Sequence, residues 1–427
     1  MKKFLKSSFI FLLGTVLSRL VSFLMIPLYT NYLPTHTMGK FDIYTTYSGA
    51  IFPVLYLEIW LALLRFLYES GEDNYVKKIF GSLKKAIVWG TIAATVIFGL
   101  FSLIFNKEDV IIIYLLVITY SFSYIYQFAA RGMQQNIDFA ISGIINTVVL
   151  SVSNILLITQ FSMGIYGLVI SNLLGNIAQI IYLEIRLKLI KKIIDSKYSS
   201  YVMKDMLNYS IPLTVNSVSY WALNSSNKLI VNNMIGLSAN GVYAISQKFS
   251  NIVAFVTTAF NYAFQDVAYS RNESGDDSKF FSNSMSYFLL ALSVGSFGII
   301  IGTRIVVHIF IGEQYQEAVQ IIPFGVLAAA ANAFSTFLGN IFGKYKQTKI
   351  ILYSTLVSSI INIALTIFMI KMMGLMGVSI ALIISLIISI LIKIVVLYKN
   401  HNIKLKLQFF IPSMLLQVIS IILYFNI

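Results

Sequence analysis

The sequence contains no cysteine, only three histidines and little acidic charge, with 17 aspartates and glutamates against 31 lysines and arginines. Without cysteine, the chain forms neither disulfides nor thiolate metal sites. The histidines are dispersed without metal-ligand spacing, and the chain has neither a glycine-rich phosphate loop nor a cluster of carboxylates. We therefore predict a protein that is not an enzyme, has no catalytic residues, and binds no cofactor and no metal.

Charged residues are few, whereas apolar residues dominate. Of the 427 residues, 58% are hydrophobic and 11% are charged, with a mean hydropathy of +0.80, against about 25% charged residues in a soluble domain. Because a membrane-spanning helix needs about 20 mostly apolar residues, the composition predicts an all-α, polytopic membrane protein. The apolar runs predict spans near 9–30, 44–67, 86–105, 110–130, 139–159, 164–184, 209–231, 247–267, 283–302, 320–341, 350–371 and 374–396, with a further apolar stretch at 408–425.

The net charge of +14 is distributed as in a membrane protein and not as in a nucleic-acid-binding protein. Basic residues gather in alternate loops, most densely between Arg186 and Lys204. The opposite loops hold four, namely Lys40, Lys107, Arg304 and Lys371. By the positive-inside rule, this asymmetry predicts a multi-pass protein of the cytoplasmic (inner) membrane with a cytoplasmic N-terminus. Lys393, one turn from the inner end of its span, is expected to snorkel to the same surface.

The chain repeats itself. Gly39 follows the first span and Gly241 the seventh, each in a short loop that turns into the next helix. The segments Met163-Gly-Ile-Tyr-Gly167 and Met373-Gly-Leu-Met-Gly377 form a second pair at nearly the same offset. Because six spans separate the copies, the repeats run parallel, which predicts two six-helix bundles related by a pseudo-two-fold axis along the membrane normal. The predicted parts are bundles 1–185 and 207–398, a cytoplasmic linker 186–206, and a C-terminal part 399–427 with an extra apolar stretch.

Four basic residues, Arg19, Arg65, Lys228 and Lys248, lie within or at the ends of apolar runs. An unpaired cation at bilayer depth costs about 2.5–3.5 kcal/mol on insertion scales, so such residues usually face a protein interior or a wet cavity. An excess of embedded cations predicts a transporter of an anionic substrate. For Arg19, snorkelling to the headgroups is the alternative role, and for Arg65 it is an ion pair with Glu69 in the same helix.

Glu58 is the one carboxylate clearly embedded in a span. An intramembrane carboxylate is a candidate for handling protons or sodium ions. A salt bridge to a cation on another span is the alternative, which the sequence leaves open.

Two spans carry polar stripes. In the eighth span, residues at alternating spacings of four and three share one helical face, and in the seventh span Asn224 and Lys228 do so. The eighth-span stripe consists of Gln247, Asn251, Ala254, Thr258, Asn261 and Gln265. A stripe of this length predicts the wall of a hydrated cavity that binds substrate, while hydrogen bonding between helices is the alternative.

Several short motifs resemble one family. Gly312-Glu-Gln-Tyr315-Gln-Glu-Ala318 is similar to a Gly-x-x-Tyr-x-x-Ala element, and the Gly39 and Gly241 turns, Arg65-Phe66 and Met373–Gly377 match as well. Together they resemble the bacterial polysaccharide flippases of the multidrug/oligosaccharidyl-lipid/polysaccharide exporter superfamily. The resemblance implies a two-bundle fold and the transfer of an oligosaccharide on undecaprenyl pyrophosphate to the outer leaflet, for O-antigen or capsule synthesis.

The resemblance also assigns roles and shows departures. Arg19 matches a cationic position in the first span of such flippases. Many relatives carry Asp-Arg where this chain has Asn227-Lys228, so the cation is kept and the carboxylate is lost. The implied partners are the lipid-linked oligosaccharide, membrane lipids, a polysaccharide polymerase and a chain-length regulator, with no nucleic acid and a monomeric state.

Three alternatives stay open at this point. A lipid II flippase shares the fold and the logic of an anionic lipid substrate. A multidrug exporter of the same superfamily should present acidic and aromatic residues to its organic cations, which the excess of basic residues opposes. A membrane-embedded sugar polymerase should carry a large outer loop or acidic catalytic motifs, and the outer loops here are short.

Overall fold

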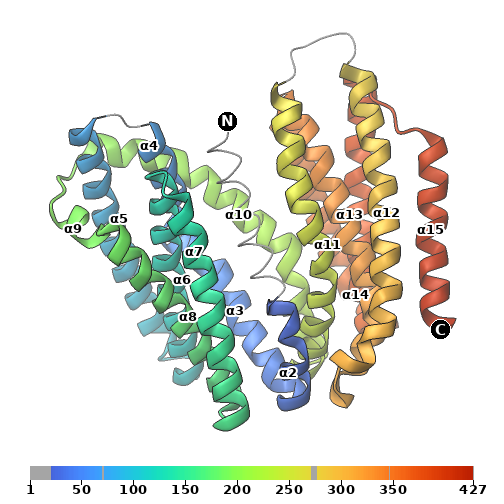
Figure 1. The fold of residues 1–427 in the computed structure, drawn as a ribbon, viewed down its shortest axis with the longest axis horizontal. Coiled ribbons are helices and arrows are strands. Elements are labelled where there is room, and N and C mark those ends of the chain that lie inside the picture. Colours follow the sequence, from blue (N-terminus) through green and yellow to red (C-terminus); the bar gives the residue numbers. More distant parts are fainter. Residues whose placement is uncertain (1–20, 70–71, 271–276, 346, 427) are drawn as a thin grey trace. The chain divides into compact units, whose positions relative to one another are not determined.

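The computed structural model describes residues 21–69, 72–270, 277–345 and 347–426, and over these ranges it contains helices and no strand (Figure 1). The all-α, polytopic fold predicted from the sequence is confirmed. The α-helices are α2 (Ile26–Tyr32), α3 (Thr35–Leu55), α4 (Ile59–Glu69), α5 (Asp73–Phe101), α6 (Lys107–Gly132), α7 (Asn136–Ile155), α8 (Gly164–Leu187), α9 (Leu189–Ile194), α10 (Ser200–Met234), α11 (Leu237–Ser270), α12 (Asp277–Phe310), α13 (Glu317–Lys344), α14 (Thr348–His401) and α15 (Leu407–Asn426). A π-helical turn, η1 (Leu156–Gln160), extends α7, and a 3₁₀ turn, η2 (Glu313–Tyr315), precedes α13.

By length and hydropathy, eight of the described helices can each cross a membrane, and the bent pair α3–α4 would add a ninth. α14 contains two of the predicted spans, because its 54 residues are kinked at Gly374. α10 and α11 fall outside this set because their polar residues lower the hydropathy. These are the two helices in which the sequence predicts polar stripes.

The chain forms two compact units. Among the described residues, the first comprises 21–25 and 40–221, and the second comprises 26–39 and 222–426. The boundary in the second half of the chain lies inside α10, beyond the linker 186–206 that the charge pattern suggests. The sequence-based division into bundles 1–185 and 207–398 therefore stays a prediction about the repeat.

The first unit is held by an apolar core and by amides between helices. Trp60, Leu63 and Phe80 are fully or almost fully buried in that core. Beside it, Gln179 of α8 accepts a hydrogen bond from Ser123 of α6 at 2.7 Å and donates one to Ser142 of α7 at 3.2 Å. Because polar side chains in a bilayer have no water to bond, such bridges stabilise helix packing.

In the second unit, the segment 26–39 is bound by the motif that the sequence analysis singled out. The Tyr315 hydroxyl donates a hydrogen bond to the Leu33 carbonyl at 3.0 Å, and Tyr315 is fully buried. A Cβ at Gly312 would lie 2.4 Å from the Thr30 carbonyl oxygen, and Thr30 itself donates to Phe310 at 2.9 Å. The tyrosine and glycine of Gly-x-x-Tyr-x-x-Ala are thus required by the close approach of α2.

The internal repeat is visible in the backbone. Gly164 and Gly374, at equivalent positions of the second sequence pair, both adopt left-handed φ angles, 53° and 56°. Such angles favour glycine because a Cβ would clash. Gly39 and Gly241 of the first pair also contact each other's helices, since a Cβ on Gly39 would lie 1.8 Å from the Leu237 oxygen. The chain has kept glycine in both copies for the same physical reasons.

The expectation for Lys393 is wrong. Its side chain does not reach the surface, since only 3% of the residue is exposed. The Lys393 ammonium donates to the carbonyl of Ser335 on α13 at 3.0 Å and to its hydroxyl at 2.7 Å. These two acceptors keep the lysine inside the second unit.

Candidate functional site

The second predicted span is broken in its middle. α3 ends at Leu55, α4 begins at Ile59, and their axes differ by 55°. The end of α3 has the hydrogen bonds of a Schellman motif, from the Glu58 amide to the Pro53 carbonyl and from the Leu57 amide to the Val54 carbonyl. The left-handed position that glycine usually fills is taken by Leu57, with φ of 49°, and Glu58 follows with φ of 45°. Two non-glycine residues in this region store strain, which is concentrated at functional sites.

The break places a carboxylate in the interior of the first unit. Glu58 is 6% exposed, and the hydroxyl of Ser217 on α10 hydrogen-bonds its carboxyl group. Glu58 Oε2 has no hydrogen-bond partner among the residues that the structure describes. The rings of Phe52, Trp60 and Tyr124 pack against one another beside the break, with centroids 5.0–5.6 Å apart. Glu58 precedes α4 and has a left-handed φ angle, so it does not continue the helical face that carries Ala62 and Arg65.

The predicted cations lie in both units. Arg65 of α4 is exposed, and its guanidinium lies over the Tyr209 ring at 4.8 Å. In the second unit Lys228 is half-buried, and Lys248 lies over the Tyr29 ring of α2 at 5.0 Å. Arg19 lies outside the described residues. Of the four predicted cations, the structure thus describes three, and two of these contact tyrosine rings.

The polar stripe of α11 has two kinds of surroundings. Toward the C-terminal end of α11, Asn261 accepts a hydrogen bond from Asn340 of α13 at 3.0 Å, and Gln265 donates to Asn340 at 2.7 Å. Toward the other end, Asn251 is exposed, and Thr258 donates to the Ala254 carbonyl at 2.6 Å. Asn261 therefore joins two helices, whereas Asn251 is free to meet solvent or substrate.

This difference leads to a labelling prediction. The chain has no native cysteine, so single cysteines can be read without background. We expect Asn251→Cys to react readily with a membrane-impermeant maleimide and Asn261→Cys to react slowly, because Asn340 covers it. Val253→Cys is the control, since Val253 is 3% exposed on another face of α11. Equal labelling at positions 251 and 253 would contradict a hydrated surface along the stripe.

The seventh span holds a second buried polar group. The Oδ1 atom of Asn227 accepts hydrogen bonds from Asn362 at 2.9 Å and from Thr366 at 3.1 Å, and all three residues are fully buried. Asn224 and Lys228, on the same helix, are half-buried. At the position where the resemblance leads one to expect a carboxylate, this unit therefore has a neutral amide cluster. Asn362 was not predicted to belong to a site, because a single asparagine in an apolar run carries no signal by itself.

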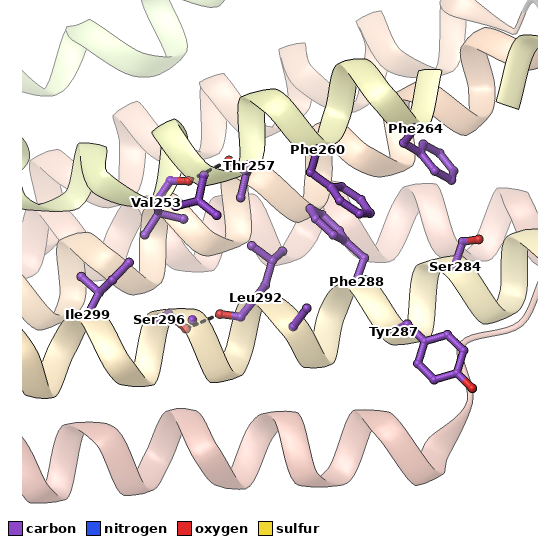
Figure 2. Close-up of a pocket in the computed structure, with 13 residues that line it drawn as sticks. Val253, Thr257, Phe260, Phe264, Ser284, Tyr287, Phe288, Leu292, Ser296 and Ile299 are labelled. Carbon is purple, nitrogen blue, oxygen red and sulfur yellow. Dashed lines mark hydrogen bonds between the residues drawn. The ribbon is translucent and has the colours of Figure 1, made fainter. Parts of the chain in front are cut away.

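A cavity of about 420 Å³ lies between α11 and α12 of the second unit. Figure 2 shows that the Phe260 ring of α11 and the Phe288 ring of α12, which both line the cavity, stack on each other, with centroids 4.6 Å apart and planes 9° from parallel. Thr257 and Ser296 also line it, but their hydroxyls donate to the backbone of their own helices, at 2.9 and 2.7 Å. We call this cavity the α11–α12 groove.

Solved structures with the same architecture are transporters. An inward-facing multidrug resistance MATE family transporter of the MOP superfamily superimposes with a TM-score of 0.71 and 14% identity, covering 90% of this chain and 96% of that one. The lipid II flippase MurJ, in an inward closed conformation, gives 0.65 and 14%, covering 97% of each chain. The MATE multidrug transporter DinF-BH gives 0.59 and 16%, covering 93% of this chain and 95% of that one. These likenesses establish the fold.

At the level of sequence, no curated protein matches the chain. The profile of one family, described as polysaccharide biosynthesis protein, does match residues 4–269, which is more than half of the chain. The matched range includes the broken span with Glu58, the cations Arg65, Lys228 and Lys248, and the whole α11 stripe. The chain is therefore a multi-pass membrane protein that belongs to the polysaccharide biosynthesis protein family.

Proposed function

We propose that this protein is a flippase that moves undecaprenyl-pyrophosphate-linked oligosaccharide repeat units across the cytoplasmic membrane by alternating access, for O-antigen or capsule synthesis. The observation that carries the proposal is the presence of basic side chains on spanning elements of both units, in a chain of the polysaccharide biosynthesis protein family. A pyrophosphate is the anionic part of such a substrate, and each cation attracts it more strongly where water is scarce. The exposed amide of Asn251 supplies hydrogen bonds for sugar hydroxyls.

The cations have separate roles in this proposal. Arg19 is the main pyrophosphate contact, Lys228 is the second contact, and Arg65 controls access from the cytoplasm. Lys248, Asn224, Thr258 and Asn261 line or support the substrate path. Glu58 couples transport to a proton or a sodium ion, since it is the buried carboxylate of the broken span and half-helix termini at such breaks are common ion sites.

The test is export of surface polysaccharide in a host that lacks its own flippase, normalised to the amount of membrane-inserted protein. Arg19→Ala should abolish export. Arg19→Lys should keep part of it, because lysine retains the positive charge and loses only the paired hydrogen bonds of the guanidinium, and Lys228 already contacts the pyrophosphate through a single ammonium charge. Lys228→Arg should be tolerated. Full export by a stably inserted Arg19→Ala, Lys228→Ala double variant would sink the proposal.

A lipid II flippase is the second candidate, favoured by the likeness to MurJ over nearly the whole chain. The two substrates share a polyprenyl diphosphate and differ in the sugar part. Two hosts distinguish the two functions. One is depleted of its lipid II flippase, and the other lacks its polysaccharide flippase. Under our proposal the protein restores surface polysaccharide in the second host and does not restore growth in the first.

A further inference from the structure

We infer that the α11–α12 groove binds the isoprenoid chain of the lipid-linked substrate, an inference that rests on the proposed function. The groove offers hydrocarbon and almost nothing else. None of the 13 described residues that line it carries a charge. Its threonine and Ser296 hydroxyls are bound to their own helices, and Ser296 also accepts a hydrogen bond from Gln417 of α15 at 2.8 Å. The hydroxyls of Ser284 and Tyr287 lie at one end of the groove (Figure 2). Along the rest of the groove a sugar or a phosphate would find no partner, so an apolar ligand is favoured there.

Beneath the groove lies a cluster of aromatic rings that pack on one another. Phe288 lies against Phe337 of α13 at 4.5 Å, and Phe337 against Phe264 at 4.3 Å between ring centroids. These three rings are buried, whereas Phe260, which stacks on Phe288, is 45% exposed and is the ring that the groove presents (Figure 2). An isoprene unit is planar at its double bond and carries a methyl branch, so it can lie flat against the Phe260 ring. A saturated chain has no planar segment to match it.

The opposite wall is formed by small residues of α12. Ala291 and Gly295 both line the groove and are both exposed, and a Cβ on Gly295 would meet nothing within 4 Å. The rim is apolar and open as well, since Val256 is 69% and Phe260 45% exposed. In a membrane-spanning helix pair these exposed apolar residues meet lipid chains and not water. A branched chain can therefore slide in from the bilayer without displacing a side chain.

The depth and the neighbours of the groove fit a substrate taken up from the cytoplasmic leaflet. Phe264 lies six residues before the end of α11 at Ser270, about 9 Å at 1.5 Å per residue. In the topology predicted from the charge asymmetry, that end is cytoplasmic. The groove and the polar stripe also share α11, on faces about a third of a turn apart. One helix can thus hold the tail of a lipid-linked sugar on one face and its head on the next.

The experiment uses the purified full-length chain in lipid nanodiscs and a polyprenyl phosphate with a diazirine in its hydrocarbon chain. Photo-crosslinks should map to the lining residues of α11 and α12. Gly295→Phe fills the groove and should lower the crosslinking yield by about tenfold or more, since each CH₂ removed from an apolar site costs about 0.8 kcal/mol. The matched control is Gly298→Phe, because Gly298 is also exposed and open but does not line the groove.

Each outcome has a defined meaning. Crosslinks on other helices, an equal yield in both variants, or equal competition by excess dioleoyl phosphatidylglycerol would overturn the inference, the last by making the groove a general lipid site. Export measured in parallel keeps the two ideas apart. Groove-specific crosslinks without export of surface polysaccharide would reject the proposed function alone, whereas normal export by a parent chain that gives no crosslinks in the groove would reject the groove alone.

Discussion

Glu58→Gln should reduce polysaccharide export by about tenfold or more while the protein inserts and folds normally. Coupling free energies between sites are typically about 1–3 kcal/mol, and the upper half of that range corresponds to such a loss. Glutamine keeps the size of the side chain and its hydrogen bond with Ser217 but is permanently neutral. If Glu58 alternates between a charged and a neutralised form during transport, glutamine holds it in one form and stops the cycle.

Glu58 is well suited to this test because its described surroundings do little to stabilise a charged carboxylate. Glu58 Oε2 has no partner among the described residues, and aromatic rings pack beside the break. Burying an ionised carboxylate without a partner is expensive, so a bound proton or metal cation must compensate at some stage. A purely structural carboxyl group would be replaced by glutamine with little effect.

Two controls complete the comparison. Ser217→Ala removes the one hydrogen bond that is described for the carboxyl group and should reduce export less than Glu58→Gln. Proton or sodium flux into proteoliposomes, measured with pH- and sodium-sensitive dyes during transport, identifies the ion. Normal export and normal ion flux in Glu58→Gln would remove Glu58 from the mechanism.

The sequence predicted the architecture well because hydropathy and charge asymmetry are properties of single segments. Within the described residues the apolar runs are helical, and the two spans that follow each other in α14 were separable because Gly374 marks the kink between them. The Gly-x-x-Tyr-x-x-Ala element was also recognisable. Its role in binding the segment 26–39 could not be predicted, because Tyr315 and Leu33 are 282 residues apart and no local pattern relates them.

The candidate site was less predictable, for reasons that the residues make clear. A helix that ends with a residue in the left-handed region usually has glycine there. In this chain that residue is Leu57, so the sequence predicted one continuous helix at 44–67. Lys393 looked like a surface lysine because its acceptors lie on another helix, α13. Asn251 and Asn261 are alike in sequence, and only Asn340 of α13 distinguishes the buried residue from the exposed one.

Gly39→Ala and Gly241→Ala should each destabilise the folded protein by about 3 kcal/mol or more, at or beyond the upper end of the range for overpacked sites. A Cβ on Gly39 would lie 1.8 Å from the Leu237 carbonyl oxygen, and one on Gly241 would lie 2.0 Å from the Thr35 carbonyl oxygen. Both obstacles are backbone atoms, so no side-chain rotation relieves the clash. The helices themselves must separate, and the hydrogen bond from Asn240 to the Gly39 carbonyl, 3.1 Å long, would be lost.

Gly49→Ala is the matched control. Gly49 lies in the same helix as Gly39, and a Cβ there would meet nothing within 4 Å. Because alanine is favoured over glycine in a helix interior by about 1 kcal/mol, this variant should be as stable as the parent or more so. The measurement is the midpoint of thermal unfolding in detergent, read as the monodisperse fraction on size exclusion. An unchanged midpoint for Gly39→Ala would show that α3 and α11 do not approach this closely.

The double variant tests whether the two glycines form one contact. Each glycine packs on the carbonyl four residues before the other, Thr35 before Gly39 and Leu237 before Gly241, so the contact is reciprocal. Once one alanine has pushed the helices apart, the second should meet less resistance. The effects of neighbouring substitutions are then not additive, and we expect the double variant to lose clearly less stability than the sum of the two single losses. Additive losses would mean that the two turns pack independently, which would contradict a reciprocal contact between the repeats.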